Sequence, residues 1–491
     1  MKSNSFLKDS IWVGISNLFI SLKGIIIIPI IIKNIGVEIY GTYVLIITMV
    51  TFLFQVSSFG VFYRYRRIAP STKNLLQLKA LFYEQFTPHA ISLIIVSSLI
   101  YINFNLISNN ILKTNTNISP LLFVLTVFLF FLYVQSNNFF RLTDRIKFFS
   151  VNQVLFPYLS ICFILIFIAF KKVSINYILF SQIISLTLIS IIPIKKIISE
   201  LGFSPILSSS KIKFNIKKGF PLVLHYLIDF FLSSSDRYVI AFFLGAAAVG
   251  VYNPAYTLGA LIIFIPKIFG AVLQPHLSRE KDNNNNTEFI KARNSIKIFL
   301  LIGIPFVVGA FFLSKSILSV LANSQIAEQS YLISPIVSAG ILFYGINTIL
   351  GTILFIEEKT IKIFYFNAIA AILNIILNIA GIYFFRSILV AAISTLFSYF
   401  VSFLFFYFNT KKYFRLSLSL KYILTIVFSS LIMGVVIFGS DYFLVISNIE
   451  SILVLTFIGV IVYGLSVTFF MPKEEKQIVK HFVERLKVKL I

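Results

Sequence analysis

Residues 331–356 read YLISPIVSAGILFYGINTILGTILFI and contain no charged side chain. A helix of this length is long enough to cross about 30 Å of hydrocarbon. Similar apolar runs, each of about 20 residues, recur from Ile11 to Phe470. The whole chain is 58% hydrophobic and only 12% charged, whereas soluble domains are roughly 45–50% apolar. The sequence therefore predicts a multi-pass membrane protein.

The predicted membrane spans are helices, because each backbone amide in lipid needs a partner within its own segment. The fold class that follows is all-α integral membrane, with about 14 transmembrane helices. The predicted spans cover residues 10–33, 40–63, 81–104, 119–140, 151–170, 175–194, 219–243, 249–274, 295–313, 331–356, 363–385, 388–408, 421–440 and 450–470.

The basic residues indicate how these spans are oriented. The chain has 42 Lys and Arg against 18 Asp and Glu, a net charge of +24. Most of the cations fall in the loops on one side of the predicted spans, and the loops on the other side hold only Lys113, Lys171, Lys172, Lys315 and Arg386. Cytoplasmic loops are enriched in Lys and Arg. We therefore expect both termini in the cytoplasm and the protein in the bacterial inner membrane, and nucleic acid is not needed to explain the charge.

An internal repeat predicts two halves. Gly36, Gly41 and Tyr43 recur at the same spacing as Gly245, Gly250 and Tyr252, each group following an odd-numbered span. Lys147 and Asn152 recur likewise as Lys362 and Asn367. Six spans per half give parallel repeats about an axis along the membrane normal. The predicted organisation is an N-lobe over residues 1–205, a C-lobe over 206–410, two extra helices over 411–471, and an amphipathic cytoplasmic tail over 472–491.

Catalytic and metal-binding motifs do not emerge from the sequence. The single cysteine, Cys162, lies in an apolar run, so a thiolate metal cluster within one chain is excluded. We expect Cys162 to be a small core residue. No catalytic residue, metal ligand or cofactor is predicted, and the chain is interpreted as a transporter rather than an enzyme, coupled to H⁺ or Na⁺ if to any ion.

The seventh predicted span carries the clearest polar stripe. His225, Asp229, Ser233 and Asp236 lie on one side of the helix, and Arg237 follows directly. Ionisable groups within a membrane usually face a partner or a water-filled cavity. Two interpretations stay open: a structural ion-pair network between helices, or the lining of a substrate or ion pathway formed by His225, Asp229, Asp236 and Arg237.

Two further spans carry stripes of small and amide residues. The eleventh aligns Asn367, Asn374 and Asn378, which are candidates for the pathway or, alternatively, for ordinary helix packing. The same two alternatives apply to Asn17 in the first span, and Lys23 lies on the opposite side of that helix as a candidate cation.

The first span also contains candidate hinge residues. Gly24 and Pro29 can bend this helix. We therefore predict a conformational hinge at these two positions.

The sequence DRYVIAFFLGAAAVGVYNPAYTLG, from Asp236 to Gly259, resembles the middle of Wzx-type polysaccharide flippases. These belong to the multidrug/oligosaccharidyl-lipid/polysaccharide exporter superfamily, and the likeness extends to residues 36–43 and to the fourteen spans. The resemblance implies two six-helix lobes around a central cavity, often cationic, that opens alternately to each side. In such a cavity, the cations Arg237 and Lys23 would suit the diphosphate head group of the lipid-linked cargo that the resemblance implies.

The cargo implied by the resemblance is an undecaprenyl-diphosphate-linked oligosaccharide repeat unit for O-antigen, lipopolysaccharide, capsule or exopolysaccharide assembly. Implied partners are membrane lipids, a polysaccharide polymerase and a chain-length regulator. Three alternatives stay open. A lipid II flippase typically has several arginines in its early spans, and Arg64 and Arg66 lie at the inner end of the second. A multidrug/cation antiporter favours acidic cavity groups, and an O-antigen polymerase needs a large external loop.

Overall fold

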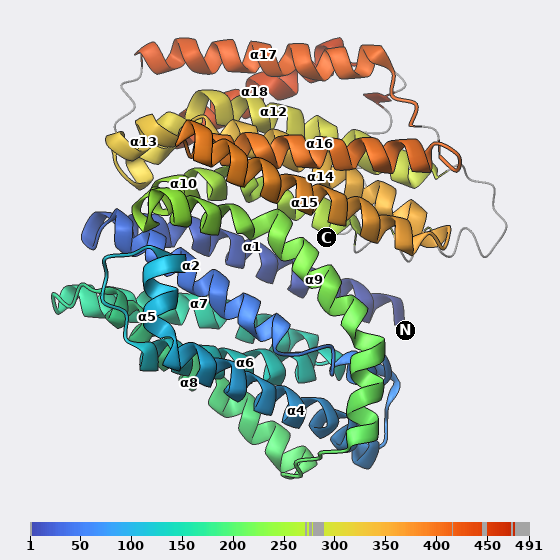
Figure 1. Ribbon diagram of the computed structural model, residues 1–491. Coiled ribbons are helices and arrows are strands. Elements are labelled where there is room, and N and C mark those ends of the chain that lie inside the picture. The colour runs from blue at the N-terminus through green and yellow to red at the C-terminus, as the bar shows by residue number, and fades with distance from the viewer. Residues whose placement is uncertain are drawn as a thin grey trace. The chain divides into compact units, whose positions relative to one another are not determined.

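The computed structural model describes residues 2–270, 273, 277, 289–414, 416–443, 449–472, 475 and 476. It divides into two compact units, residues 1–253 and residues 254–491. Each unit is a bundle of helices (Figure 1). The predicted amphipathic tail, apart from its first residue and residues 475 and 476, lies outside the described residues.

Thirteen helices in the described part of the chain are long and apolar enough to cross a membrane, which confirms thirteen of the predicted spans. Six of them lie in the first unit: α1 (Lys2–Asn34), α2 (Val37–Val56), α4 (Leu75–Ile102), α6 (Pro120–Leu142), α7 (Ile146–Ala169) and α8 (Ile175–Leu201). The seventh, residues 246–270, begins with α10 (Ala246–Gly259). The others lie in the second unit: α12 (Ile290–Leu321), α14 (Ile333–Ile356), α15 (Thr360–Phe385), α16 (Leu389–Thr410), α17 (Leu420–Phe443) and α18 (Ile449–Phe470).

Helix α9 (Ser209–Leu244) occupies the seventh predicted span but is not among the thirteen. It is longer than the predicted range 219–243 because it begins in the basic segment that contains Lys211, Lys213, Lys217 and Lys218. These lysines and the polar stripe lower its hydropathy. The helix has the length to cross a membrane, and its composition sets it apart from the other long helices.

The second predicted span, 40–63, ends earlier than expected. Helix α2 stops at Val56, and residues 57–62 form a turn before the short helix α3 (Tyr63–Ile68). Within the turn, Phe59 and Gly60 both have a positive φ. A Cβ on Gly60 would lie 2.3 Å from the backbone carbon of Gly219 in α9. The turn therefore depends on close contact between the backbones of Gly60 and Gly219. Hydropathy cannot predict such a contact.

In the first unit, α6 packs against α4, α7 and α8, and α1 packs against α7. One core cluster joins α3, α4, α6 and α8 through Tyr65, Phe82, Phe139 and Leu201. Cys162 lies exposed on α7, so its predicted core position is wrong. A cysteine thiol is small and needs no polar partner, so it can face lipid from a membrane-spanning helix. The apolar run around Cys162 therefore did not distinguish a core position from a lipid-facing one.

In the second unit, α14 packs against α12 and α16, and α15 packs against α16. The two C-terminal helices, α17 and α18, pack against each other and against α12 (Figure 1). The buried Lys297 ammonium of α12 donates to Glu475 Oε1 at 2.6 Å, just beyond α18. This contact joins the segment that follows α18 to α12.

The compact units divide after Asn253, whereas the predicted lobes divide after residue 205. The difference arises because α9 packs on α2, α3 and α4. The predicted boundary follows the count of spans and stays a prediction.

Candidate functional site

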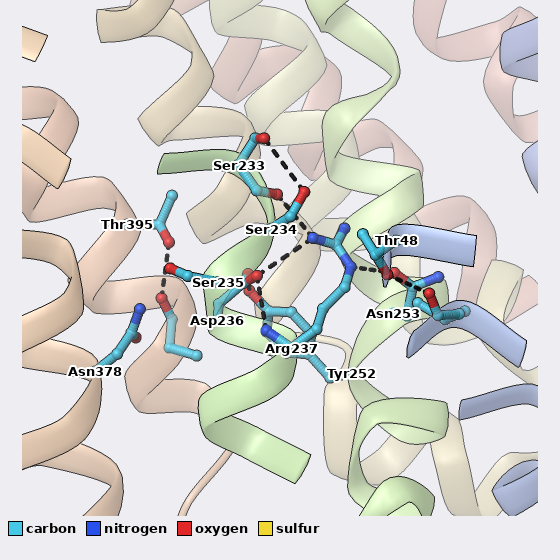
Figure 2. Close-up of polar contacts among 12 residues, drawn as sticks. Thr48, Ser233, Ser234, Ser235, Asp236, Arg237, Tyr252, Asn253, Asn378 and Thr395 are labelled. Carbon is cyan, nitrogen blue, oxygen red and sulfur yellow. Dashed lines mark hydrogen bonds and ion pairs between the residues drawn. The ribbon is translucent and has the colours of Figure 1, made fainter. Parts of the chain in front are cut away.

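Arg237 and Asp236 lie buried near the end of α9, with 8% and 3% of their surface exposed. The Arg237 guanidinium donates to Asn253 Oδ1 at 2.9 Å, to the Ser233 carbonyl at 2.7 Å and to Asp236 Oδ1 at 3.2 Å. Figure 2 shows the Arg237 side chain between Asp236 and Asn253. The hydroxyl of Tyr252 donates to the second carboxylate oxygen of Asp236 at 2.6 Å.

This network joins three helices. Asn253 of α10 donates to the Tyr40 hydroxyl of α2 at 2.8 Å, and Tyr238 of α9 donates to the Leu45 carbonyl of α2 at 3.0 Å. Tyr40 and Tyr252 are among the largest fully buried side chains. We call the group formed by Tyr40, Asp236, Arg237, Tyr252 and Asn253 the Arg237 network.

The repeated glycines permit the network to form. A Cβ on Gly41 would lie 1.9 Å from the Ala246 carbonyl oxygen, and one on Gly250 would lie 2.1 Å from the Val37 carbonyl oxygen. Only glycine allows α2 and α10 to approach this closely. The sequence repeat thus corresponds to a contact between its own members, Gly41 and Gly250.

The polar stripe of α9 separates into two parts. Asp236 and Arg237 have the arrangement of a structural ion-pair network, which was one of the two interpretations. His225 and Asp229 are instead half-exposed, with His225 Nε2 3.7 Å from Asp229 Oδ2. A pathway role for these four residues stays a prediction, and His225 and Asp229 have the accessibility that such a role requires.

The asparagines of α15 lie in the second unit. Asn378 donates to Asn374 Oδ1 at 3.0 Å, and Asn374 donates to Thr395 Oγ1 of α16 at 3.3 Å. Asn374 and Asn378 are buried and Asn367 is half-buried. Figure 2 includes Asn378 and Thr395. These bonds join two neighbouring helices, as the packing interpretation requires, and the pathway role stays a prediction.

On α1, Asn17 is exposed, and Lys23 and Gly24 are half-buried. The helix runs from Lys2 to Asn34 with Pro29 inside it. The roles of Asn17 and Lys23 in the pathway, and of Gly24 and Pro29 as a hinge, stay predictions.

A second group of charged residues, which no sequence pattern brings together, lies where α3, α4 and α9 meet. Arg64 of α3 donates to both oxygens of Glu84 at 3.1 Å. Lys211 of α9 lies 3.5 Å from Glu84 Oε2, and Asn215 donates to Glu84 Oε1 at 3.0 Å. Glu84 is 3% exposed, whereas the side chains of Arg64 and Lys211 are 35% and 44% exposed.

Arg66 extends this group along α3. Its guanidinium donates to the Tyr226 hydroxyl at 2.6 Å and lies 3.9 Å from the centre of the Phe62 ring. Arg141 of α6 is near enough to Arg66 to interact electrostatically. We call Arg64, Arg66, Arg141 and Lys211, together with Glu84, the cationic cluster. Two of these cations, Arg64 and Lys211, lie against the Glu84 carboxylate, and the cluster of four cations and one carboxylate keeps an excess of positive charge.

A buried chain of hydrogen bonds lies close to Arg66. The Phe54 carbonyl can only accept, so His89 Nε2 donates to it at 3.1 Å. His89 Nδ1 must then accept from Gln135 Nε2 at 2.9 Å, and Gln135 Oε1 accepts from Gln85 at 3.1 Å. The chain therefore fixes the orientation of both amides.

A small cavity adjoins this chain of hydrogen bonds. Within the described residues, Gln85 Oε1 and the Tyr65 hydroxyl are buried without a hydrogen bond. Both residues line this cavity together with Arg66, His89 and Gln135. Buried polar atoms of this kind usually bond to ordered water, so the cavity can hold water next to the Arg66 guanidinium.

The sequence did contain a signal for the cationic cluster. Glu84 and His89 lie inside the predicted span 81–104, and an ionisable residue within a span is by default a candidate functional residue. For metal ions, the described part of the chain contains no group of three or more His, Cys, Asp or Glu side chains that could hold one.

The sequence profile described as Polysaccharide biosynthesis protein matches residues 6–281, more than half of the chain. The chain belongs to the polysaccharide biosynthesis protein family. A second profile, described as MatE, matches residues 221–380 of this family member. The matched regions include all of the first unit from residue 6 and much of the second.

A curated relative of this polysaccharide biosynthesis protein is the probable low-salt glycan biosynthesis flippase Agl15 of Haloferax volcanii, 24% identical over 247 residues. The alignment spans 50% of this chain and 52% of the relative, so the chain matches about half the length of that protein.

Two solved structures share the fold. Lipid II flippase MurJ, in an inward closed conformation, aligns with a TM-score of 0.76 and 18% identity over 94% of this chain and 98% of its own. An inward-facing multidrug resistance MATE family transporter of the MOP superfamily aligns with a TM-score of 0.58 and 14% identity, over 84% of this chain and 95% of its own. The fold of this chain is therefore similar to the folds of these two transporters.

Proposed function

We propose that this family member is a flippase that moves a diphosphate-linked oligosaccharide lipid, such as an O-antigen or capsule repeat unit, across the inner membrane by alternating access. The observation that carries the proposal is the cationic cluster. Arg64, Arg66 and Lys211 bring charge-assisted donors together in one unit of a transporter fold, and arginine in particular can bind a phosphate through two parallel hydrogen bonds.

The charge of the cluster favours an anionic cargo over a cationic drug. The four cations of the cluster outnumber its single carboxylate, so the cluster would repel a cation, whereas it would attract a diphosphate electrostatically. The half-buried ring of Tyr226 beside Arg66 offers a flat apolar surface next to the charge, which suits a sugar ring joined to phosphate. The cargo is moved without a covalent change, so the proposal includes no catalytic residue.

The orientation predicted from the basic loops supports this assignment. Arg64 and Lys211 lie in loops or helix ends assigned to the cytoplasmic side, where lipid-linked precursors would be loaded. We propose H⁺ or Na⁺ as the coupling ion and a polymerase and a chain-length regulator as downstream partners. Lipid II remains the second candidate cargo, because the flippase with the TM-score of 0.76 is named for it.

The test is a deletion strain with its lipid-linked intermediates extracted and analysed. We expect the oligosaccharide unit to be complete in composition, confined to the cytoplasmic leaflet, and absent from surface polymer. Accumulation of lipid II together with loss of cell-wall synthesis would favour the second candidate. Finding the complete unit on the outer leaflet, in a strain with no other flippase, would refute the proposal.

A further inference from the structure

An apolar groove of about 430 Å³ lies on the first unit, beside the cationic cluster. Its walls come from the turn after α2, from α4, and from the start of α9 with the preceding loop. Large branched side chains dominate the lining, among them Val61, Ile91, Ile95, Leu207, Ile212 and Ile216. Several of these are exposed, and Ile95 and Leu207 have exposed fractions of 56% and 64%.

On each wall of the groove, a lining residue lies within about one helical turn of a member of the cationic cluster along the chain. Val61 precedes Arg64 on the first wall, Pro88 follows Glu84 on α4, and Ile212 follows Lys211 on α9. Charged and apolar surfaces are therefore side by side.

The walls are held by hydrogen bonds. Tyr83 of α4 donates to the Gly202 carbonyl at 2.7 Å, and the Ile206 amide donates to Thr87 Oγ1 at 3.3 Å. These contacts fix the loop before α9 against α4. The groove is thus a built apolar surface whose walls adjoin members of the cationic cluster along the chain.

We infer that this groove binds the polyprenyl tail of the cargo lipid while the cationic cluster holds its diphosphate. The inference rests on the proposed function and deepens it, because it names where the lipid enters the first unit. A positively charged cluster next to an apolar groove is complementary to a lipid whose anionic head joins an apolar chain. A single groove lined by branched aliphatic side chains fits one branched chain, whereas a membrane phospholipid carries two acyl chains.

The experiment uses the full-length protein in nanodiscs of phosphatidylcholine. The probe is undecaprenyl diphosphate with a photoreactive diazirine in the chain, and crosslinked peptides are located by mass spectrometry. We expect crosslinks in residues 88–96 and 207–216, reduced by unlabelled undecaprenyl diphosphate and unaffected by phosphatidylglycerol.

Filling the groove provides the matched test. In the Ile95→Trp variant an indole occupies the groove, whereas Ile94→Trp places the same indole at a neighbouring exposed position (52% exposed) that does not line it. Displacing two chain carbons should weaken binding by about tenfold or more. We expect this loss for Ile95→Trp and not for Ile94→Trp, and Ile91→Trp provides a second groove variant if the first does not fold.

Three outcomes would overturn the inference: no crosslink in either peptide, equal crosslinking of the Ile95→Trp and wild-type proteins, or equal displacement by phosphatidylglycerol. The last would assign the groove to a membrane phospholipid. Transport of a labelled lipid-linked oligosaccharide is measured in parallel vesicles. Crosslinking without transport would refute the proposed function and leave the groove assignment intact. Transport without crosslinking would refute the groove assignment and leave the proposed function intact.

Discussion

The Arg237→Ala variant tests whether the Arg237 network stabilises the fold or forms part of the cargo pathway. Removing the guanidinium leaves the buried Asp236 carboxylate without this cation. It also removes the hydrogen bond that Arg237 donates to Asn253 Oδ1. Breaking one side of a buried ion pair costs about 3–5 kcal/mol. Tyr252 still donates to Asp236, so we expect the lower end of this range. This loss is a large fraction of the stability of a typical protein.

The assay measures the fraction of purified protein that stays monodisperse after heating in detergent. Arg237→Lys keeps the charge but loses the planar fork, so we expect an intermediate loss of about 1–2 kcal/mol. Asp236→Asn combined with Arg237→Gln removes both charges and should recover most of the stability. Transport is then measured for the protein that remains folded. An Arg237→Ala protein with wild-type heat resistance but without transport would show that the structural interpretation is wrong and that Arg237 acts on the cargo.

Two further predictions concern packing and topology. Gly41→Ala should destabilise the protein by about 1–3 kcal/mol or more, because its new Cβ would meet the Ala246 carbonyl oxygen at 1.9 Å. Gly14→Ala is the control, since no described atom lies within 4 Å of its Cβ; equal heat resistance of the two variants would contradict the close helix contact. A periplasm-active reporter fused after Arg386 should be active and one fused after Lys411 inactive, and the opposite pattern would invalidate the predicted orientation.

The membrane helices could be predicted from the sequence because hydropathy is a local property. Residues 331–356, for example, correspond closely to α14, which begins at Ile333. The turn after Val56 could not be predicted in this way, because it depends on the backbone of Gly60 meeting that of Gly219 from a distant helix. The beginning of α9 at Ser209 was missed for the opposite reason: a helix that contains Lys211 continues outside the apolar segment.

The candidate site was predicted in part. A helical stripe places residues on one face, and it correctly grouped His225 with Asp229, which face each other across 3.7 Å. The stripe could not separate that exposed pair from the buried Asp236, because burial depends on the neighbouring α2 and α10. The cationic cluster was missed because its members come from separate helices. The signal for it was the presence of ionisable residues, Glu84 and His89, inside a predicted span.

The two charged groups of the first unit differ in a way that assigns them different tasks. In the Arg237 network the carboxylate and the guanidinium are both buried and bonded to each other and to their neighbours. Bringing a phosphate there would require breaking those bonds in a poorly solvated site, which is costly. In the cationic cluster the acid, Glu84, is buried, whereas Arg64 and Lys211 stay partly exposed. A phosphate could therefore approach these cations while Glu84 keeps them in place. Stability and cargo binding are thus expected to respond to different substitutions, the first to changes at Arg237 and the second to changes at Lys211.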